Sequence, residues 1–150
     1  MPALQRRSSR TAATMPEGRL LMAGSSRWIL RAVEPRVERV HDVREQARAV
    51  LELWRVDEDL RWGVELLLTE LVTNAVRHAR TPFTIILRWD GHLFRGEVTD
   101  ADPRPLRPRL DASTDGLGGR GLLLVREIAT AWGVDVHQHG KTVWFTITRP

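Results

Sequence analysis

Two polar side chains, Glu70 and Asn74, have the spacing needed for joint chemistry on one helix face. They lie four residues apart in the segment E-L-V-T-N-A-V-R-H-A, so on an α-helix they are one turn apart, and His78 continues the row. An asparagine offers a neutral carbonyl oxygen, which suits a hard cation such as Mg²⁺ that also binds nucleotide phosphates. A carboxylate one turn away can orient or deprotonate a hydroxyl nucleophile.

The alternative interpretation is that this polar row is the solvated face of a surface helix, which is the usual fate of such a pair. Apolar side chains of the same segment fall on roughly the opposite arc: Leu68, Leu71, Val72, Ala75 and Ala79. The segment nevertheless lacks the acidic-basic ladder and the lysines that are typical of an exposed helix. We therefore expect the row to face something other than water.

Four glycines within six residues form a second candidate feature: Gly116, Gly118, Gly119 and Gly121. A predicted helix over residues 120–131 follows them. Glycines let backbone N–H groups approach an anion, a helix N-terminus supplies partial positive charge, and Arg120 can add a guanidinium, so the turn is a candidate phosphate site. Taken alone, the glycines also fit a flexible loop with a helix cap. The pattern matches neither a Walker P-loop nor a dinucleotide-binding fingerprint, which needs a strand directly before it.

Asp100 ends a predicted strand, where the chain passes into a long loop. A carboxylate accepts hydrogen bonds and donates none, so it suits the exocyclic amine of adenine and disfavours the carbonyl of guanine. An equally good interpretation from the residues alone is that Asp100 and Asp102 only begin the turn before Pro103.

The elements that must position these residues follow from apolar periodicity and turn residues. Helical spacing predicts helices over residues 36–54, 57–79 and 120–131. Strand composition predicts strands over residues 28–33, 83–90, 93–100, 134–137 and 142–148. Asp57 lies at the expected start of the second helix, and Asp90-Gly91 is expected to turn between two strands.

The order of these elements, β-α-α-β-β-loop-α-β-β, predicts the fold class. Helices and strands come in blocks, which favours a two-layer α/β sandwich with a mixed, mostly antiparallel sheet and helices on one face, rather than a doubly wound parallel fold. Residues 101–119 contain three prolines and several turn residues, and a loop of that length is typical of a functional lid or binding loop.

Composition narrows the function classes. The 150 residues, 42% of them hydrophobic, suit one domain with its own core. The absence of cysteine excludes disulfides and thiolate metal sites. No apolar stretch is long enough for a membrane span and no secretory signal begins the chain, so we expect a soluble, cytoplasmic protein that contacts no membrane.

The net charge of +4 is concentrated near the N-terminus. Residues 1–26 contain four arginines and one glutamate, while the remainder is nearly neutral. We expect residues 1–26 to be a disordered or extended basic arm. Only Lys141 among the 23 basic residues is a lysine, so the high isoelectric point reflects guanidinium groups rather than a nucleic-acid surface.

Three segments in this order resemble the motifs of the GHKL ATPase superfamily: E-L-V-T-N-A-V-R-H-A, E-V-T-D-A-D-P and G-L-G-G-R-G-L-L-L-V-R-E-I-A-T-A-W-G-V. Within it they are most similar to the bacterial anti-sigma-factor serine/threonine kinases and their small stand-alone relatives. The similarity covers about residues 36–148. It implies that residues 27–150 are a GHKL-like ATP-binding domain with ATP and Mg²⁺ as its ligands.

The resemblance also implies roles for single residues. Glu70 would be the catalytic base, Asn74 the Mg²⁺ ligand and Asp100 the residue that reads adenine. The cofactor-binding set then includes residues of the glycine turn and the last hairpin: Gly116, Gly118, Gly119, Arg120, Gly121 and Thr142. Gly119 and Gly121 would flank the triphosphate beneath a lid at about residues 103–118.

Two departures from the family pattern concern the expected adenine site, and a third is Leu117, which stands near a position where an arginine usually precedes the glycine turn. The family's adenine motif usually continues as Asp-x-Gly-x-Gly, whereas here Asp100 is followed by Ala-Asp-Pro-Arg. The family's last hairpin usually has glycine followed by threonine, whose hydroxyl helps to bind adenine. Here Gly140 is followed by Lys141, and Thr142 is displaced by one residue.

Kinases of this kind bind a sigma factor in one state and phosphorylate a serine of an antagonist protein in another, and they often form homodimers. The altered adenine motif favours an alternative, a non-catalytic ATP-sensing module that sequesters a protein partner. A histidine kinase fragment, suggested by His41, is disfavoured because the dimerising helical hairpin is missing. Direct nucleic-acid binding is disfavoured by the neutral body, and a metal site at His137 and His139 lacks a third ligand nearby.

Overall fold

The computed structural model describes residues 19–102 and 126–150. These ranges form six strands, two α-helices and one π-helical turn: β1 (Arg19–Ala23), β2 (Ser25–Val33), α1 (Val37–Leu53), α2 (Glu58–Asn74), η1 (Ala75–Ala79), β3 (Phe83–Trp89), β4 (Leu93–Asp100), β5 (Ala131–His137) and β6 (Gly140–Thr148). Residues 126–128 are helical as well. The two predicted helices before β3 are therefore confirmed almost to the residue.

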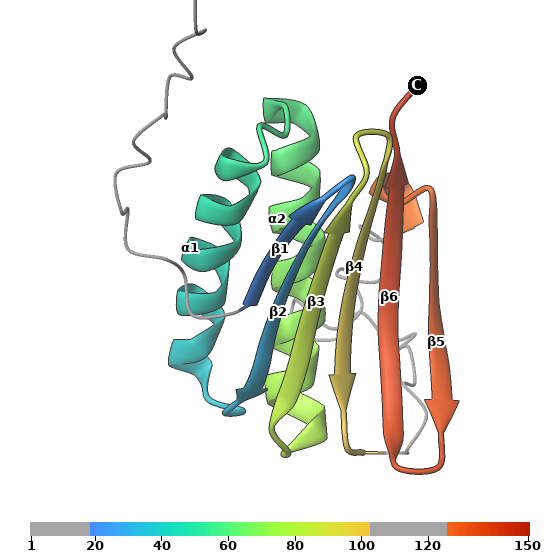
Figure 1. Ribbon diagram of the computed structural model, residues 1–150. Helices are drawn as coiled ribbons and strands as arrows, with labels where there is room; N and C mark the ends of the chain where they lie inside the picture. Colours follow the sequence, from blue (N-terminus) through green and yellow to red (C-terminus); the bar gives the residue numbers. More distant parts are fainter. Residues whose placement is uncertain (1–18, 103–125) are drawn as a thin grey trace, which may run out of the picture.

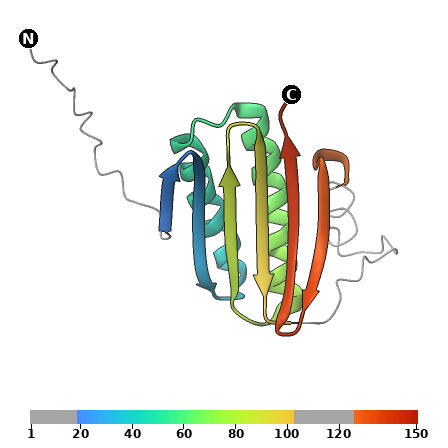
Figure 2. The same ribbon diagram turned by 45° about the vertical axis from the view of Figure 1, so that its right-hand side comes forward.

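The strands form one sheet in the order β1-β2-β3-β4-β6-β5, and α1 and α2 cover one of its faces (Figures 1 and 2). The predicted two-layer α/β sandwich is confirmed. Each pairing between described strands is antiparallel. The parallel pairing that a mixed sheet requires is therefore not found within the described residues.

The start of α2 follows from its sequence. The carboxylate of Asp57 caps the helix by accepting a hydrogen bond from the backbone N–H of Leu60 at 3.1 Å. Glu58 and Asp59 add negative charge to the first turn, where the helix dipole favours it. Further along, Arg48 of α1 pairs with Glu65 of α2 at 3.0 Å, which ties the two helices together.

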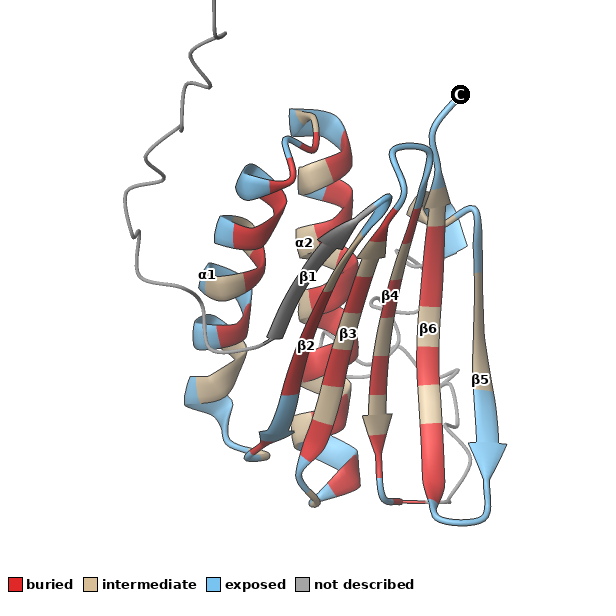
Figure 3. Cartoon of the chain, viewed as in Figure 1, coloured by how far each residue is buried: buried red, intermediate tan, exposed pale blue. Residues whose placement is uncertain are grey.

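The core lies between the helices and the sheet. On β3 the side chains alternate between buried (Phe83, Ile85, Leu87, Trp89) and half-buried (Thr84, Ile86, Arg88), and Figure 3 shows this banding along the strands. On β4 the buried set is Phe94, Gly96, Val98 and Asp100. Successive side chains of a strand point to opposite faces, so Asp100 shares the helix-covered face with the apolar core.

Two aromatic contacts of β6, one on each face of the sheet, depend on glycine. A Cβ added to Gly96 would lie 2.5 Å from the ring of Phe145, and one added to Gly133 would lie 2.7 Å from the ring of Trp144. The missing side chains let aromatic rings of β6 approach the backbone of the neighbouring strands closely. These contacts hold β4, β5 and β6 in the register that brings the end of β4 beside the start of β6.

Residues 19–26, which the sequence analysis assigned to the N-terminal arm, form β1 and the first residues of β2. Arg19 pairs with Ile29 and Ala23 with Ser25, around a turn at Gly24 whose φ is +69°. A four-residue apolar run cannot be recognised as a strand without its partner, which is why composition favoured an arm. Residues 1–18 lie outside the described residues.

Two further differences concern the helix ends and the last hairpin. The second helix continues to Ala79 as predicted, but its last five residues form the π-helical turn η1. The third helix, predicted over residues 120–131, ends at residue 128 in the described range, and β5 begins at Ala131, three residues before the predicted strand. Pairing with β6, where Ala131 is opposite Thr146, overrides the helical preference of this segment.

Candidate functional site

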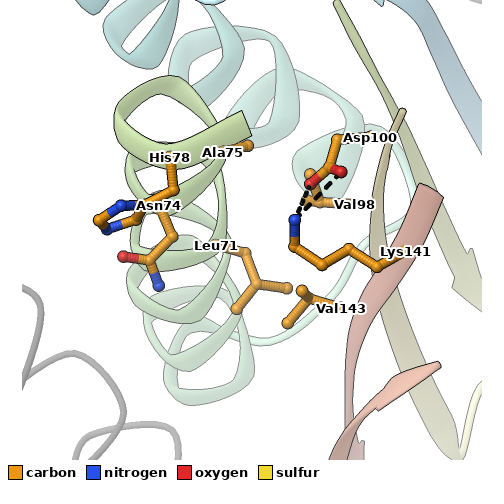
Figure 4. Close-up of a pocket in the computed structure, with 8 residues that line it drawn as sticks. All are labelled: Leu71, Asn74, Ala75, His78, Val98, Asp100, Lys141 and Val143. Atoms are coloured by element: carbon orange, nitrogen blue, oxygen red, sulfur yellow. Dashed lines mark hydrogen bonds and ion pairs between the residues drawn. The ribbon is translucent and has the colours of Figure 1, made fainter. Parts of the chain in front are cut away.

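Three segments that are far apart in the sequence converge on one small pocket. It lies between the end of α2, the end of β4 and the start of β6 (Figure 4), and its lining residues are Leu71, Asn74, Ala75, His78, Val98, Asp100, Lys141 and Val143. The cavity volume is about 10 Å³, which is close to the space of one water molecule. The structure thus brings the predicted site residues Asn74 and Asp100 together.

Glu70 is buried, with 6% of its surface exposed. The interpretation of the polar row as a solvated face is therefore wrong for this residue. Its Oε2 atom has no hydrogen-bond partner within the described ranges. Burial raises the pKa of the Glu70 carboxyl above its usual range, and the positive charge of Arg77 offsets part of that rise. An ionised carboxylate in this position is costly, so the group is ready to accept a proton.

Asn74 is the last residue of α2, one turn after Glu70, and it is half-buried in the pocket wall. The π-helical turn η1 begins directly after it and ends at Ala79, and the next residue, Arg80, has a φ of +50°. π-turns are rare, and they occur often at functional sites. His78 lies within this turn and also lines the pocket, while remaining exposed on its other side.

Asp100 makes an ion pair at the bottom of the pocket. Lys141 Nζ lies 3.2 Å from each carboxylate oxygen of Asp100 and donates a further hydrogen bond to the backbone carbonyl of Asp102 at 3.1 Å. Both side chains of the pair are 4% exposed. Figure 4 shows the Lys141 ammonium directed at the carboxylate.

The same carboxylate also shapes the turn that follows. The backbone N–H of Asp102 donates to Asp100 Oδ1 at 2.8 Å. The interpretation of Asp100 as a turn-initiating residue is thus compatible with its place in the pocket, since one oxygen serves both contacts.

Lys141 lines the pocket, and the sequence analysis did not select it as a site residue. It was noted as the single lysine and as a departure from the family pattern, and it stands opposite Asp100 in the β4–β6 ladder. A Cβ added to the preceding residue, Gly140, would lie 1.9 Å from the carbonyl oxygen of Asp100. Only glycine allows β6 to start this close to the end of β4. A single lysine among 22 arginines, placed directly after that glycine, was the available sequence signal.

Thr142 is not brought into the pocket. It lies on the opposite face of the sheet, where its hydroxyl is 2.8 Å from that of Thr99 and 3.1 Å from Nε2 of His137. A shift of one residue along a strand moves a side chain to the other face, so the displaced threonine cannot take the role that the family motif implies. His139 is exposed, and no cluster of three metal-ligating side chains occurs in residues 19–102 and 126–150.

The glycine turn lies outside the described residues. This applies to all five of its predicted site residues: Gly116, Gly118, Gly119, Arg120 and Gly121. The pocket described above is therefore the part of the predicted site formed by α2, β4 and β6. None of the helices in the described ranges is both long and apolar enough to cross a membrane.

Known proteins share the domain family and the fold of this chain. The model of the histidine kinase-like ATPase domain matches residues 33–147. Among solved structures, the chain is similar to the crystal structure of the RsbU and RsbW domains of Rv1364c from Mycobacterium tuberculosis, with a TM-score of 0.60 and 19% sequence identity. That match covers 81% of this chain and 33% of the other, so this chain spans about a third of its length. At this identity the likeness shows the fold alone. No protein of curated function matches the chain.

Proposed function

Since the chain belongs to the histidine kinase-like ATPase family, we propose that it is an ATP-binding regulatory protein that acts as an anti-sigma-factor-type serine/threonine kinase. The observation that carries the proposal is the convergence of Asn74 and Asp100 in one pocket, with the buried carboxyl of Glu70 one helical turn away. The fold is that of a GHKL-type ATPase domain, whereas the substrate and partner are part of the proposal.

The base of the nucleotide would occupy the end of the pocket near Asp100. Its walls there are apolar, formed by Leu71, Val98 and Val143, and such walls suit the faces of a flat ring. The Asp100 carboxylate would accept a hydrogen bond from an exocyclic amine, which adenine has at this edge and guanine replaces with a carbonyl.

The phosphates would extend toward Asn74. Its half-buried amide provides an oxygen of the kind that Mg²⁺ accepts beside phosphate oxygens, so this residue fits the metal. When bound, Mg²⁺ supplies positive charge to the phosphate oxygens. We propose that Gly119, Arg120 and Gly121 contact the triphosphate from the glycine turn.

Glu70 would act as the general base. Its Oε2 atom, which has no hydrogen-bond partner in the described ranges, would accept the proton of a serine or threonine hydroxyl of the partner protein. The hydroxyl oxygen then bonds to the γ-phosphorus as the bond to the β–γ bridging oxygen breaks, and ADP leaves. The raised pKa of the Glu70 carboxyl favours the proton transfer.

The proposed partners are a sigma factor and an antagonist protein in the cytoplasm, and a homodimer is the proposed assembly. The second candidate is a non-catalytic ATP-sensing module that sequesters a partner. The altered adenine motif, in which Asp100 is followed by Ala-Asp-Pro-Arg, favours this candidate.

The test combines nucleotide binding with phosphoryl transfer. Calorimetry with ATP, with and without Mg²⁺, is compared between wild type and Asn74→Ala, which we expect to lose the Mg²⁺-dependent part of the affinity. Labelled ATP and a candidate antagonist protein are then added. We expect transfer that falls about 10²- to 10⁴-fold in Glu70→Ala while ATP binding is kept. Binding without transfer would favour the sensing module, and no binding would exclude both candidates.

A further inference from the structure

The hydrogen-bonding groups at the bottom of the pocket already have partners within the chain. The three N–H donors of the Lys141 ammonium have three acceptors within 3.2 Å: both oxygens of Asp100 and the carbonyl of Asp102. Asp100 Oδ1 also accepts from the backbone N–H of Asp102. An incoming base would therefore meet a carboxylate whose oxygens are both in use.

The space at this position is also taken. The remaining cavity of about 10 Å³ admits one water molecule and no aromatic ring. The backbone on either side of Lys141 has little freedom, because Gly140 packs against the Asp100 carbonyl and the Asp100–Lys141 pair belongs to the β4–β6 ladder. The side chain of Lys141 is flexible, so it can rotate out of the pocket while the strand pairing is kept.

We propose that Lys141 is a displaceable occupant of the base subsite and is the residue that sets the nucleotide affinity of this protein. Its ammonium takes the place of the amine of the base, and the nucleotide binds only to molecules in which Lys141 has left Asp100. This inference rests on the proposed function, since it assigns a role within the same pocket.

The size of the effect follows from the population of open molecules. The apparent dissociation constant equals the intrinsic one divided by the fraction that is competent to bind. If the buried pair is closed in nine molecules out of ten, removal of the Lys141 ammonium tightens binding about tenfold. A more stable pair gives a larger change.

The first experiment uses the unmodified protein, because Lys141 is its only lysine. Reductive methylation with ¹³C-formaldehyde, followed by peptide mapping, reports the reactivity of this one side chain, with the α-amino group as internal standard. Lys141 is 3% exposed, so we expect slow methylation without ligand and at least severalfold faster methylation at saturating Mg-ATP. The reactivity of the α-amino group should not change.

The second experiment measures ATP affinity by calorimetry in Lys141→Met. We expect a dissociation constant at least about tenfold lower than that of wild type. Arg95→Met is the matched control, because Arg95 is a cation on the other face of the sheet, where it contacts Glu97 and lies 4.5 Å from the centre of the Trp144 ring. Its removal should leave the affinity unchanged.

The outcomes separate this inference from the proposed function. Faster methylation with ATP, or ATP binding that is tight in Lys141→Met and weak in wild type, supports the displacement of Lys141. ATP binding with Lys141 still protected, or an affinity that Lys141→Met leaves equal or weaker, overturns the inference while the ATP site stands. If neither form binds ATP, the proposed function fails and the inference fails with it.

Discussion

The two faces of the β4–β6 strand pair carry polar groups at neighbouring positions, and they differ in what water can reach. On the helix-covered face, Asp100 and Lys141 form an ion pair, and each of the two side chains is 4% exposed. On the other face, Thr99 meets Thr142 at 2.8 Å, and Arg95 pairs with Glu97, whose side chains are 31% and 14% exposed.

This difference in exposure to water indicates which face of the sheet can hold a ligand-binding site. Polar groups on the open face exchange their partners for water at little cost, so these contacts add modestly to stability. A buried pair has no such substitute, and loss of one partner leaves an uncompensated charge. Only a ligand that supplies new hydrogen bonds can replace Lys141 at Asp100, which is why we assign the binding function to the covered face.

The largest effect should come from Gly140→Ala. The added Cβ would lie 1.9 Å from the Asp100 carbonyl oxygen, so the start of β6 must move away from β4. We expect a loss of about 5 kcal/mol or more in the free energy of unfolding, measured by urea denaturation. Gly91→Ala is the control, because its φ is +94° but no atom lies within 4 Å of the new Cβ, and strain alone costs about 1–2 kcal/mol. Equal losses would show that the close approach at Gly140 is unimportant.

The second prediction compares the two ion pairs directly by double-mutant cycles. Breaking the buried pair by Lys141→Met should cost about 3–5 kcal/mol, because Asp100 is left without its counter-ion. Arg95→Met should cost about 1 kcal/mol or less. In Lys141→Met with Asp100→Asn, part of the loss should be recovered. Additive losses at the buried pair would contradict the coupling between its partners.

The third prediction concerns Glu70, a buried carboxyl whose Oε2 atom has no hydrogen-bond partner among the described residues. Because its pKa is raised in the folded state, its contribution to stability is complete below the ordinary pKa of glutamate and is lost as the pH rises through the folded-state value. Glu70→Gln, which carries no charge, should therefore raise the melting temperature at pH 8, and the difference from wild type should shrink as the pH is lowered toward 4.

Glu127→Gln is the control for that measurement, because Glu127 is exposed. Its melting curves should follow those of wild type at each pH. A Glu70→Gln protein less stable than wild type at pH 8 would mean that the ionised carboxylate is stabilised, against the inferred effect of burial.

The smallest effect should come from Thr142→Val on the open face. It removes the hydrogen bonds with Thr99 and His137, which costs about 1 kcal/mol, and leaves the pocket untouched. ATP affinity measured by calorimetry should match that of wild type. A tenfold loss of affinity would mean that Thr142 takes part in nucleotide binding. Our placement of the nucleotide on the helix-covered face would then be wrong.

Much of the fold followed from local sequence patterns. The apolar spacing of α1 and α2, the cap at Asp57 and the turn at Asp90-Gly91 are short-range features, and the structure agrees with each. The strands at the two edges of the described sheet were harder to predict from the sequence. β1 was missed and β5 was predicted too short, because both depend on a partner strand rather than on their own composition.

For the candidate site, the sequence by itself singled out candidate side chains on α2 and β4, because a spacing of four residues on a helix and a carboxylate at a strand end are local features; their roles stay predictions. Glu70, Asn74 and Asp100 were identified in this way. Only the tertiary structure decided that Glu70 is buried, that Lys141 reaches Asp100 and that Thr142 points away. These facts depend on the register of β6 against β4, and a register involves residues 41 positions apart, whose relative placement no local pattern encodes.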